Sequence, residues 1–272
     1  MIRLNYHSDD WIMSRVKDHY NEALEHFPED RIVCLVLQGS QNYGLDYEGS
    51  DIDTKLIVTP TFEEIAMNKK SISTTHIREN EEHIDFKDIR LYIQTFRKQN
   101  LNFLEILFSP YAIVNPLYKE QWNRLVQARE EIAHYAPVQA IKSMKGIAKE
   151  KYHAMEHHYP ARMAWIEKFG YDPKQLHHLL RVNEYISRYI DGESYETCLQ
   201  SKMSEYLQAV KLGFHNLDDA RMIANWAIGC IDKMCDEYLK KCSAEVDKEV
   251  DALLDDVQYN IMKIAIKKEI GD

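Results

Sequence analysis

Two aspartates separated by one residue, Asp51 and Asp53, form the pattern in the sequence best suited to holding a metal ion. Side chains alternate between the two faces of a β-strand, so in an extended segment these carboxylates project from the same face. Two carboxylates so close together repel each other unless a cation lies between them. Their oxygen atoms suit Mg²⁺, which commonly takes one or two protein carboxylates together with phosphate oxygens. The pair therefore predicts a Mg²⁺ site, with Mn²⁺ as the alternative ion.

A phosphate-binding turn is predicted shortly before this pair. Gly39 and Ser40 follow a short apolar run, and Ser40 lies eleven positions before Asp51. A glycine lets the backbone approach a phosphate, and the residues after it can begin a short helix whose free N–H groups face an anion. The Ser40 hydroxyl can add a donor. An anion-binding turn beside paired metal ligands predicts a triphosphate site; the alternative is an ordinary β-turn before a solvated strand start.

Together, the two motifs resemble the signature of nucleotidyltransferases of the DNA-polymerase-β superfamily. Members of that superfamily carry a third carboxylate on a later strand, between apolar residues. Asp85 stands in this context in the segment Ile-Asp-Phe at 84–86, so the resemblance implies Asp85 as the third metal ligand, with Asp88 as the alternative. Glu82 and Asp88 are otherwise expected to be solvated surface charges. The implied fold is α+β: a small mixed β-sheet with flanking helices, followed by an all-helical domain.

A fuller set of residues resembles, more narrowly, the bacterial and phage nucleotidyltransferases associated with RNA repair. It comprises the turn at 39–45, the segment 99–109 with its asparagines and Glu105, and the segment 170–181. The resemblance implies a nucleotide-binding role for Gly39, Ser40, Tyr43, Gly44, Ser50, Lys174, His178 and Arg181. One departure from the pattern is Gln41-Asn42, which stands where a basic or small residue is usual; it bears on which nucleotide is held.

The reaction that this resemblance implies is transfer of a nucleoside monophosphate from a nucleoside triphosphate (NTP) to an acceptor hydroxyl, with release of pyrophosphate. Two Mg²⁺ ions, about 3.5–4 Å apart, would lie between the attacking and leaving oxygens. An RNA end is the first expectation for the acceptor, and a protein or small molecule is the second. A non-catalytic nucleotide-binding or partner-binding module, such as a toxin–antitoxin component, is the alternative of another class. The net charge of −10 argues against broad, sequence-independent RNA binding.

The predicted elements place these motifs at the ends of strands. A helix is expected from Ser8 to about Phe27, and strands are expected at 32–37, 52–58, 72–77 and 83–86. From residue 88 onward the apolar periodicity is helical, with stretches at 88–98, 101–108, 117–131, 137–157, 173–190, 195–211, 217–241 and 246–269. We therefore predict a catalytic nucleotidyltransferase domain at 1–115 and a helical domain covering the cleft at 116–272.

The predicted helix at 173–190 has one face rich in polar and basic side chains. At about 100° per residue these fall on one side of the helix axis: Lys174, His177, His178, Arg181, Tyr185 and Arg188. Leucines and isoleucines occupy the opposite side. Such a face could lie over the triphosphate and offset the charge of the leaving pyrophosphate; the alternative is an ordinary solvated helix face.

The overall composition is that of a soluble globular protein, with 45% hydrophobic and 29% charged residues. An odd number of cysteines without Cys-x-x-Cys spacing argues against a disulfide framework or a zinc site: Cys34, Cys198, Cys230, Cys235 and Cys242. The N-terminus lacks the apolar segment of a secretory signal, and no apolar run reaches the roughly 18 residues of a membrane span. A cytoplasmic protein with no membrane association is expected; the oligomeric state is left open.

Overall fold

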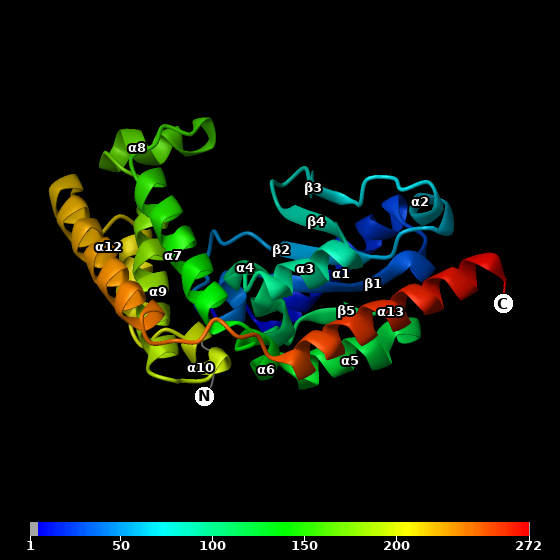
Figure 1. Cartoon of the computed structure of the whole chain (residues 1–272). Helices are drawn as coiled ribbons and strands as arrows, with labels where there is room; N and C mark the ends of the chain where they lie inside the picture. The colour runs from blue at the N-terminus through cyan, green and yellow to red at the C-terminus, as the bar shows by residue number, and fades with distance from the viewer. Residues whose placement is uncertain (1–4, 272) are drawn as a thin grey trace. The chain divides into compact units, whose positions relative to one another are not determined.

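A computed structural model describes residues 5–271 and contains one five-stranded sheet and a series of helices (Figure 1). The strands are β1 (Ile32–Gln38), β2 (Asp53–Val58), β3 (Ser73–Ile77), β4 (His83–Asp88) and β5 (Ala112–Val114). The α-helices are α1 (Asp9–His26), α2 (Phe62–Ala66), α3 (Ile89–Arg97), α4 (Leu101–Leu104), α5 (Lys119–Gln127), α6 (Arg129–Ala133), α7 (Pro137–Ala154), α8 (Met163–Phe169), α9 (Pro173–Ile190), α10 (Tyr195–Leu199), α11 (Ser204–Lys211), α12 (Leu217–Leu239) and α13 (Lys248–Ile270). Short 3₁₀ turns are η1 (Glu29–Arg31), η2 (Ser40–Asn42), η3 (Glu105–Phe108), η4 (Pro116–Tyr118) and η5 (Pro160–Arg162).

The sheet is mixed, with strand order β3-β4-β2-β1-β5. β2 and β4 run parallel, and the other neighbouring pairs are antiparallel. This arrangement confirms the predicted α+β class with a small mixed sheet. The four predicted strands are present within a residue or two of their expected bounds, whereas β5, a three-residue edge strand beside β1, was missed because so short an apolar run carries no clear alternation.

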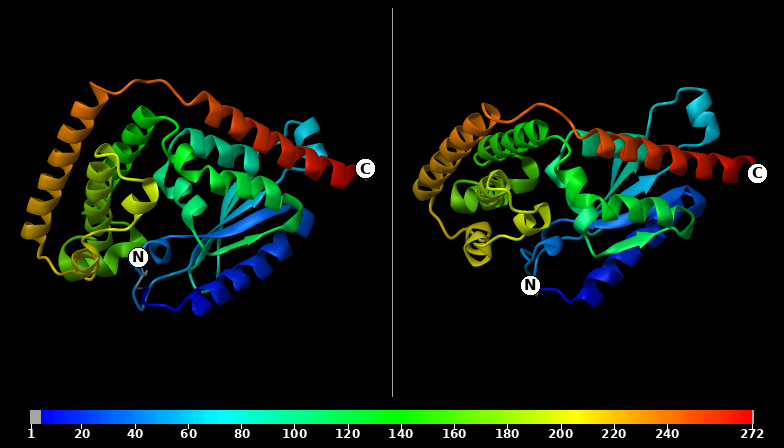
Figure 2. Two further views of the ribbon diagram at one scale, coloured as in Figure 1. Left: turned by 90° about the horizontal axis from the view of Figure 1, so that it is seen from below. Right: turned by 60° about the horizontal axis from the view of Figure 1, so that its bottom comes forward.

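The sheet has helices on both faces, in agreement with the almost continuous burial of residues along β1 and β2. On one face, α1 buries Ile12 and Val16 against a core that includes Leu56 of β2 and Ile84 of β4. On the other face, α3 buries the aromatic ring of Tyr92 together with other apolar side chains. Figure 2 shows α1 and α3 on opposite faces. The central strands β1 and β2 are therefore fixed on both faces, and the residues at their ends are held in place by the core behind them.

Two compact units make up the chain: Met1–Tyr135 together with Val246–Asp272, and Ala136–Glu245. This division differs from the predicted domains 1–115 and 116–272 in two places. Helices α5 and α6 belong to the first unit, and so does α13, which lies along α5 and α3 (Figure 2). The reason is tertiary packing, since helical periodicity along the chain does not show against which body a helix packs.

In the second unit, α9 is the central helix and packs against α7, α10, α11 and α12. Its predicted polar face is therefore mostly covered, with His177, Arg181, Tyr185 and Arg188 buried. An ordinary solvated face is therefore excluded for these four residues, because the neighbouring helices surround α9. Among residues 5–271, none of the helices combines the length and apolar character needed to span a membrane.

Candidate active site

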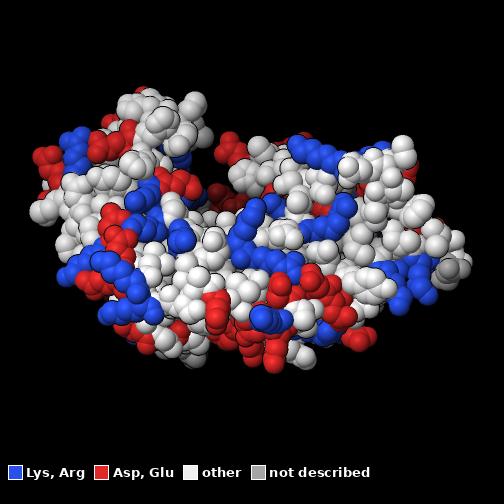
Figure 3. Space-filling view, viewed as in Figure 1, with Lys and Arg blue, Asp and Glu red and all other residues white. Residues whose placement is uncertain are grey.

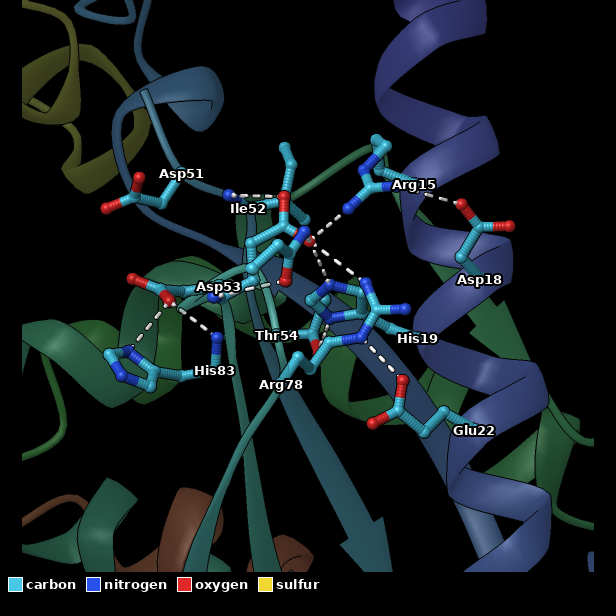
Figure 4. A network of polar contacts seen from close by, with 12 residues as sticks. Arg15, Asp18, His19, Glu22, Asp51, Ile52, Asp53, Thr54, Arg78 and His83 are labelled. Carbon is cyan, nitrogen blue, oxygen red and sulfur yellow. Dashed lines mark hydrogen bonds and ion pairs between the residues drawn. The ribbon is translucent and has the colours of Figure 1, made fainter. Parts of the chain in front are cut away.

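The start of β2 presents the paired aspartates to one side of the sheet. Ile52, between them, is fully buried in the core that α1 covers, whereas Asp51 is exposed and Asp53 is half-buried. Figure 4 shows both carboxylates pointing the same way, away from α1. One carboxylate oxygen of Asp53 (Oδ1) accepts the backbone N–H of His83 at 3.2 Å. Asp51 precedes the strand and Asp53 is its first residue, yet the two carboxylates lie side by side as the sequence predicts.

The turn after β1 lies directly beside this pair. Gln38, the last residue of β1, is the antiparallel partner of Asp53. Gly39 and Ser40 therefore follow β1 at the end of the sheet where β2 begins. Gly39 has φ 113°, a conformation that favours glycine. The side-chain amide of Gln41 donates a hydrogen bond to the backbone oxygen of Asp51 at 2.8 Å. The turn and the aspartate segment are therefore held together.

Glu105 anchors the same turn from the other side and was not among the predicted site residues. Glu105 is 1% exposed, and its carboxylate accepts the backbone N–H of Gly39 at 2.8 Å. The neighbouring Asn102 accepts the side-chain amide of Gln38 through its backbone oxygen at 3.0 Å. The segment that resembles the RNA-repair enzymes thus positions the end of β1. The resemblance included Glu105, but the residues around it do not indicate that its carboxylate would accept the backbone N–H of Gly39.

A buried polar network fixes β2 from the α1 side (Figure 4). One oxygen of Glu82, Oε2, accepts hydrogen bonds from Arg15, His19, Arg78 and Asn80, and the other, Oε1, accepts the backbone N–H of Ile52 at 3.4 Å. These are charge-assisted contacts in a site where Glu82 is only 6% exposed. The expectation that Glu82 is a solvated surface charge was wrong.

The electrostatics of this network favour the ionised carboxylate. Burial alone would raise the pKa of Glu82, but the hydrogen bonds from His19, Arg15 and Asn80 outweigh it and lower that pKa to about 2. His19 extends the network to the strand, because its Nδ1 lies 2.9 Å from the hydroxyl of Thr54. The charged carboxylate therefore links α1, the segment before β4 and the backbone between the two aspartates.

Asp85 and Asp88 of β4 have different surroundings. Asp85 is the parallel partner of Lys55, two residues after Asp53, and its carboxylate lies 2.6 Å from the Lys55 ammonium and 3.2 Å from the hydroxyl of Thr75. Alternation therefore places Asp85 on the same face of the sheet as Asp53. Asp88 is on the other face, is 1% exposed, caps α3 and pairs with Arg90. It is not a solvated charge.

The remaining predicted residues of this turn shape the loop and do not border the carboxylates. Tyr43 is 7% exposed, and Gly44 adopts φ 69° where the chain turns back. The hydroxyl of Ser50 accepts the backbone N–H of Tyr47 at 2.9 Å, which closes the loop before Asp51. Gly39 and Ser40 border the carboxylates directly, whereas Tyr43, Gly44 and Ser50 shape the loop that carries them.

Lys174, His178 and Arg181 lie on α9 in the second unit. Lys174 and His178 are half-buried, and Arg181 is 7% exposed. Burial, the adjacent His177 and the charges of Arg181, Lys174 and Lys151 hold the pKa of His178 well below its usual value. Within this unit the positive charge near His178 therefore comes from lysine and arginine side chains.

The carboxylates at the start of β2 are residues that could hold Mg²⁺. Asp51 and Asp53 offer oxygen ligands on one side of the strand start, which is the donor type and number that Mg²⁺ commonly takes from a protein. Within residues 5–271, no three His, Cys, Asp or Glu side chains come together as a ready cluster of ligands.

A mixed sheet with paired aspartates at a strand start beside a Gly-Ser turn defines the polymerase-β type of nucleotidyltransferase fold. A family model matches residues 15–184, more than half of the chain, from within α1 to within α9. The chain belongs to the RNA repair pathway DNA polymerase beta family (RlaP). No relative among curated proteins matches the sequence.

Proposed function

We propose that this protein is a Mg²⁺-dependent nucleotidyltransferase that transfers a nucleoside monophosphate from an NTP to the hydroxyl of an RNA end. The observation that carries this proposal is the placement of Asp51 and Asp53 on one side of β2, beside the Gly39–Ser40 turn. Membership of an RNA repair family supports an RNA acceptor. The net charge of −10 limits that acceptor to local contacts.

Each residue of the site has a part in this proposal. Asp51 and Asp53 hold Mg²⁺, which supplies positive charge between the phosphate and the reacting oxygens. Ser40 and the backbone after Gly39 bind the β- and γ-phosphates. Asp85, once it is released from Lys55, completes the ligand set and accepts the proton of the attacking hydroxyl. Lys174, His178 and Arg181 are the nucleotide-binding candidates of the second unit.

The test is incubation of the protein with each of the four labelled NTPs and Mg²⁺, with and without single-stranded RNA. We expect label on the RNA and release of pyrophosphate with at least one NTP. Asp51→Asn and Asp53→Asn should each lower the rate by at least about 100-fold, because most of the acceleration in phosphoryl transfer comes from charge stabilisation and positioning.

Glu48→Gln provides the matched control, since Glu48 is exposed in the same loop and its loss of one negative charge should leave the rate unchanged. Label that migrates with a polypeptide or a small molecule would replace the RNA acceptor but keep the reaction. NTP binding without turnover by the wild-type protein would contradict the enzymatic proposal and favour a nucleotide-binding module.

A further inference from the structure

A group of basic side chains surrounds an aromatic ring on the face of the sheet that carries the paired aspartates. The ammonium nitrogens of Lys55 and Lys87 lie 4.6 and 4.5 Å from the centre of the Phe103 ring. Both distances are within the range of cation–π attraction. We call Lys55, Lys87 and Phe103 the lysine–phenylalanine cluster. Its two lysines come from neighbouring strands, β2 and β4, and its ring comes from α4.

Positive charge prevails around this cluster. Lys55 and Lys98 lie near enough to Lys87 for their charges to act on it, and Asp85 supplies the opposite charge among these neighbours. Lys55 already pairs with that aspartate at 2.6 Å. A protein with a net charge of −10 thus gathers three lysines around one carboxylate at this place. Figure 3 shows Lys and Arg side chains gathering where Figure 1 shows α3.

The position of the cluster relative to the site suggests what it binds. In the strand order, β1 with the Gly39–Ser40 turn lies on one side of β2, and β4 with Lys87 lies on the other. Lys55 follows Asp53 by two residues on the same face, and Lys87 pairs with Ile57, so the cluster begins beside the site and extends along the sheet away from Asp53. In an in-line transfer, the hydroxyl attacks the phosphorus from the side opposite to the leaving pyrophosphate. Lys55 pairs with Asp85, the carboxylate that we propose accepts the proton of the attacking hydroxyl, so the cluster lies beside the expected place of the acceptor.

We propose that the lysine–phenylalanine cluster, with Lys98, is a binding subsite for backbone phosphates of the acceptor RNA near its reacting end. Lys87 and the exposed Lys98 contact the phosphodiesters, and Phe103 holds the ammonium groups of Lys55 and Lys87 in position. The subsite rests on the proposed function for its RNA acceptor. Such a subsite would let a protein with a net negative charge bind RNA, because the contact is confined to a short basic stretch of the sheet face.

The experiment measures binding rather than turnover. A fluorescently labelled single-stranded RNA is titrated with the full-length protein at several salt concentrations, and a labelled NTP is titrated separately. For Lys87→Gln we expect several-fold weaker RNA binding and a salt slope smaller by roughly 0.7, the value for one lost phosphate contact on a single strand. NTP binding should stay unchanged.

Two further variants serve as controls. Lys17→Gln removes the same charge from an exposed position on α1, at the opposite face of the sheet, and should bind RNA like the wild type. Lys87→Arg keeps the charge and should retain most of the affinity. If thermal unfolding shows that Lys87→Gln is not folded, Lys98→Gln takes its place with the same expected loss.

Three results would overturn the subsite. The first is an unchanged RNA affinity and salt slope in the folded lysine variants. The second is an equal loss of NTP affinity, which would assign the lysines to the triphosphate. The third is a wild-type protein that does not bind RNA at all. In that third case, nucleotidyl transfer to another acceptor would leave the reaction standing, so the two proposals fail separately.

Discussion

At the scale of single residues, the carboxylate of Glu82 holds in place the segment that carries the paired aspartates. Its hydrogen bonds to α1, to Arg78 and to the backbone of Ile52 hold the start of β2 in place. The sequence predicted Asp51 and Asp53 because spacing and residue type sufficed. It did not predict Glu82, since an acidic residue in a run of charges gives no sign of burial until α1 and β4 are brought together.

The network predicts an acid-sensitive stability. The pKa of Glu82 is lowered from 4.5 to about 2 in the folded protein. Its stabilisation is therefore complete above pH 4.5 and is lost as the pH falls toward 2. It amounts to no more than about 3 kcal/mol. Urea unfolding between pH 6 and pH 3 should show a weaker pH dependence in Glu82→Gln, and equal slopes in variant and wild type would contradict this account.

At the scale of helices and strands, the register of β4 decides which of its two aspartates lies on the same face of the sheet as Asp53. The sequence placed this strand correctly but left Asp85 and Asp88 as alternatives. Register settles their faces, because Asp85 is the partner of Lys55 and Asp88 is the partner of Val58. Hydrogen bonding with β2 fixes that register, and the register cannot be predicted from the sequence of β4 alone.

A pair of substitutions separates the two roles. Asp88→Ala removes the cap of α3 and the ion pair with Arg90, so the free energy of unfolding should fall by about 1–2 kcal/mol. Its Mg²⁺ dependence of transfer should match the wild type. Asp85→Asn should shift that Mg²⁺ dependence to higher concentration. The reverse pattern, measured by denaturation and by Mg²⁺ titration of activity, would make Asp88 the third ligand.

The buried helix α9 predicts a second acid-sensitive region. Burial lowers the pKa of His177 from 6.5 to about 3, and its Nδ1 lies 2.8 Å from the backbone oxygen of Leu207. The neutral ring therefore stabilises the fold above pH 6.5, and this contribution is lost as the pH falls toward 3, by at most about 1.4 kcal/mol per pH unit.

Hydrogen exchange of α9 and α11 peptides, followed by mass spectrometry, measures this effect locally. Acidification from pH 6.5 to pH 4.5 should reduce the free energy of opening in the wild type and less so in His177→Asn. Exposed His157 supplies the control, because His157→Asn should keep the wild-type response. An identical response in all three proteins would show that His177 is not the group involved.

The whole molecule is two units in which the second interrupts the first in sequence. The helices themselves were largely predictable from apolar periodicity. Their assignment was not, because α13 returns to the first unit, where Arg97 pairs with Asp251 and Asp255, and Arg124 pairs with Asp256. Such long-range pairing leaves no mark in a local sequence window.

The return of α13 predicts that this helix contributes to the stability of the first unit. Leu254 is fully buried on α13, whereas Tyr259 on the same helix is 63% exposed. Leu254→Ala should lower the free energy of unfolding of the first unit by about 2–5 kcal/mol, and Tyr259→Ala should change it by less than about 0.5 kcal/mol. The measurement is thermal and urea unfolding. Similar small effects of both substitutions would show that α13 does not stabilise this unit.

The central claim, that Asp51 and Asp53 jointly hold a divalent ion against a triphosphate, is tested most directly by Mn²⁺ binding. Free Mn²⁺ is counted by electron paramagnetic resonance while the protein is titrated with an NTP analogue that cannot be cleaved between its α- and β-phosphates. We predict analogue-dependent Mn²⁺ binding that weakens at least about tenfold in Asp53→Asn and disappears in the folded Asp51→Asn/Asp53→Asn variant. Undiminished Mn²⁺ binding by that double variant would contradict the account.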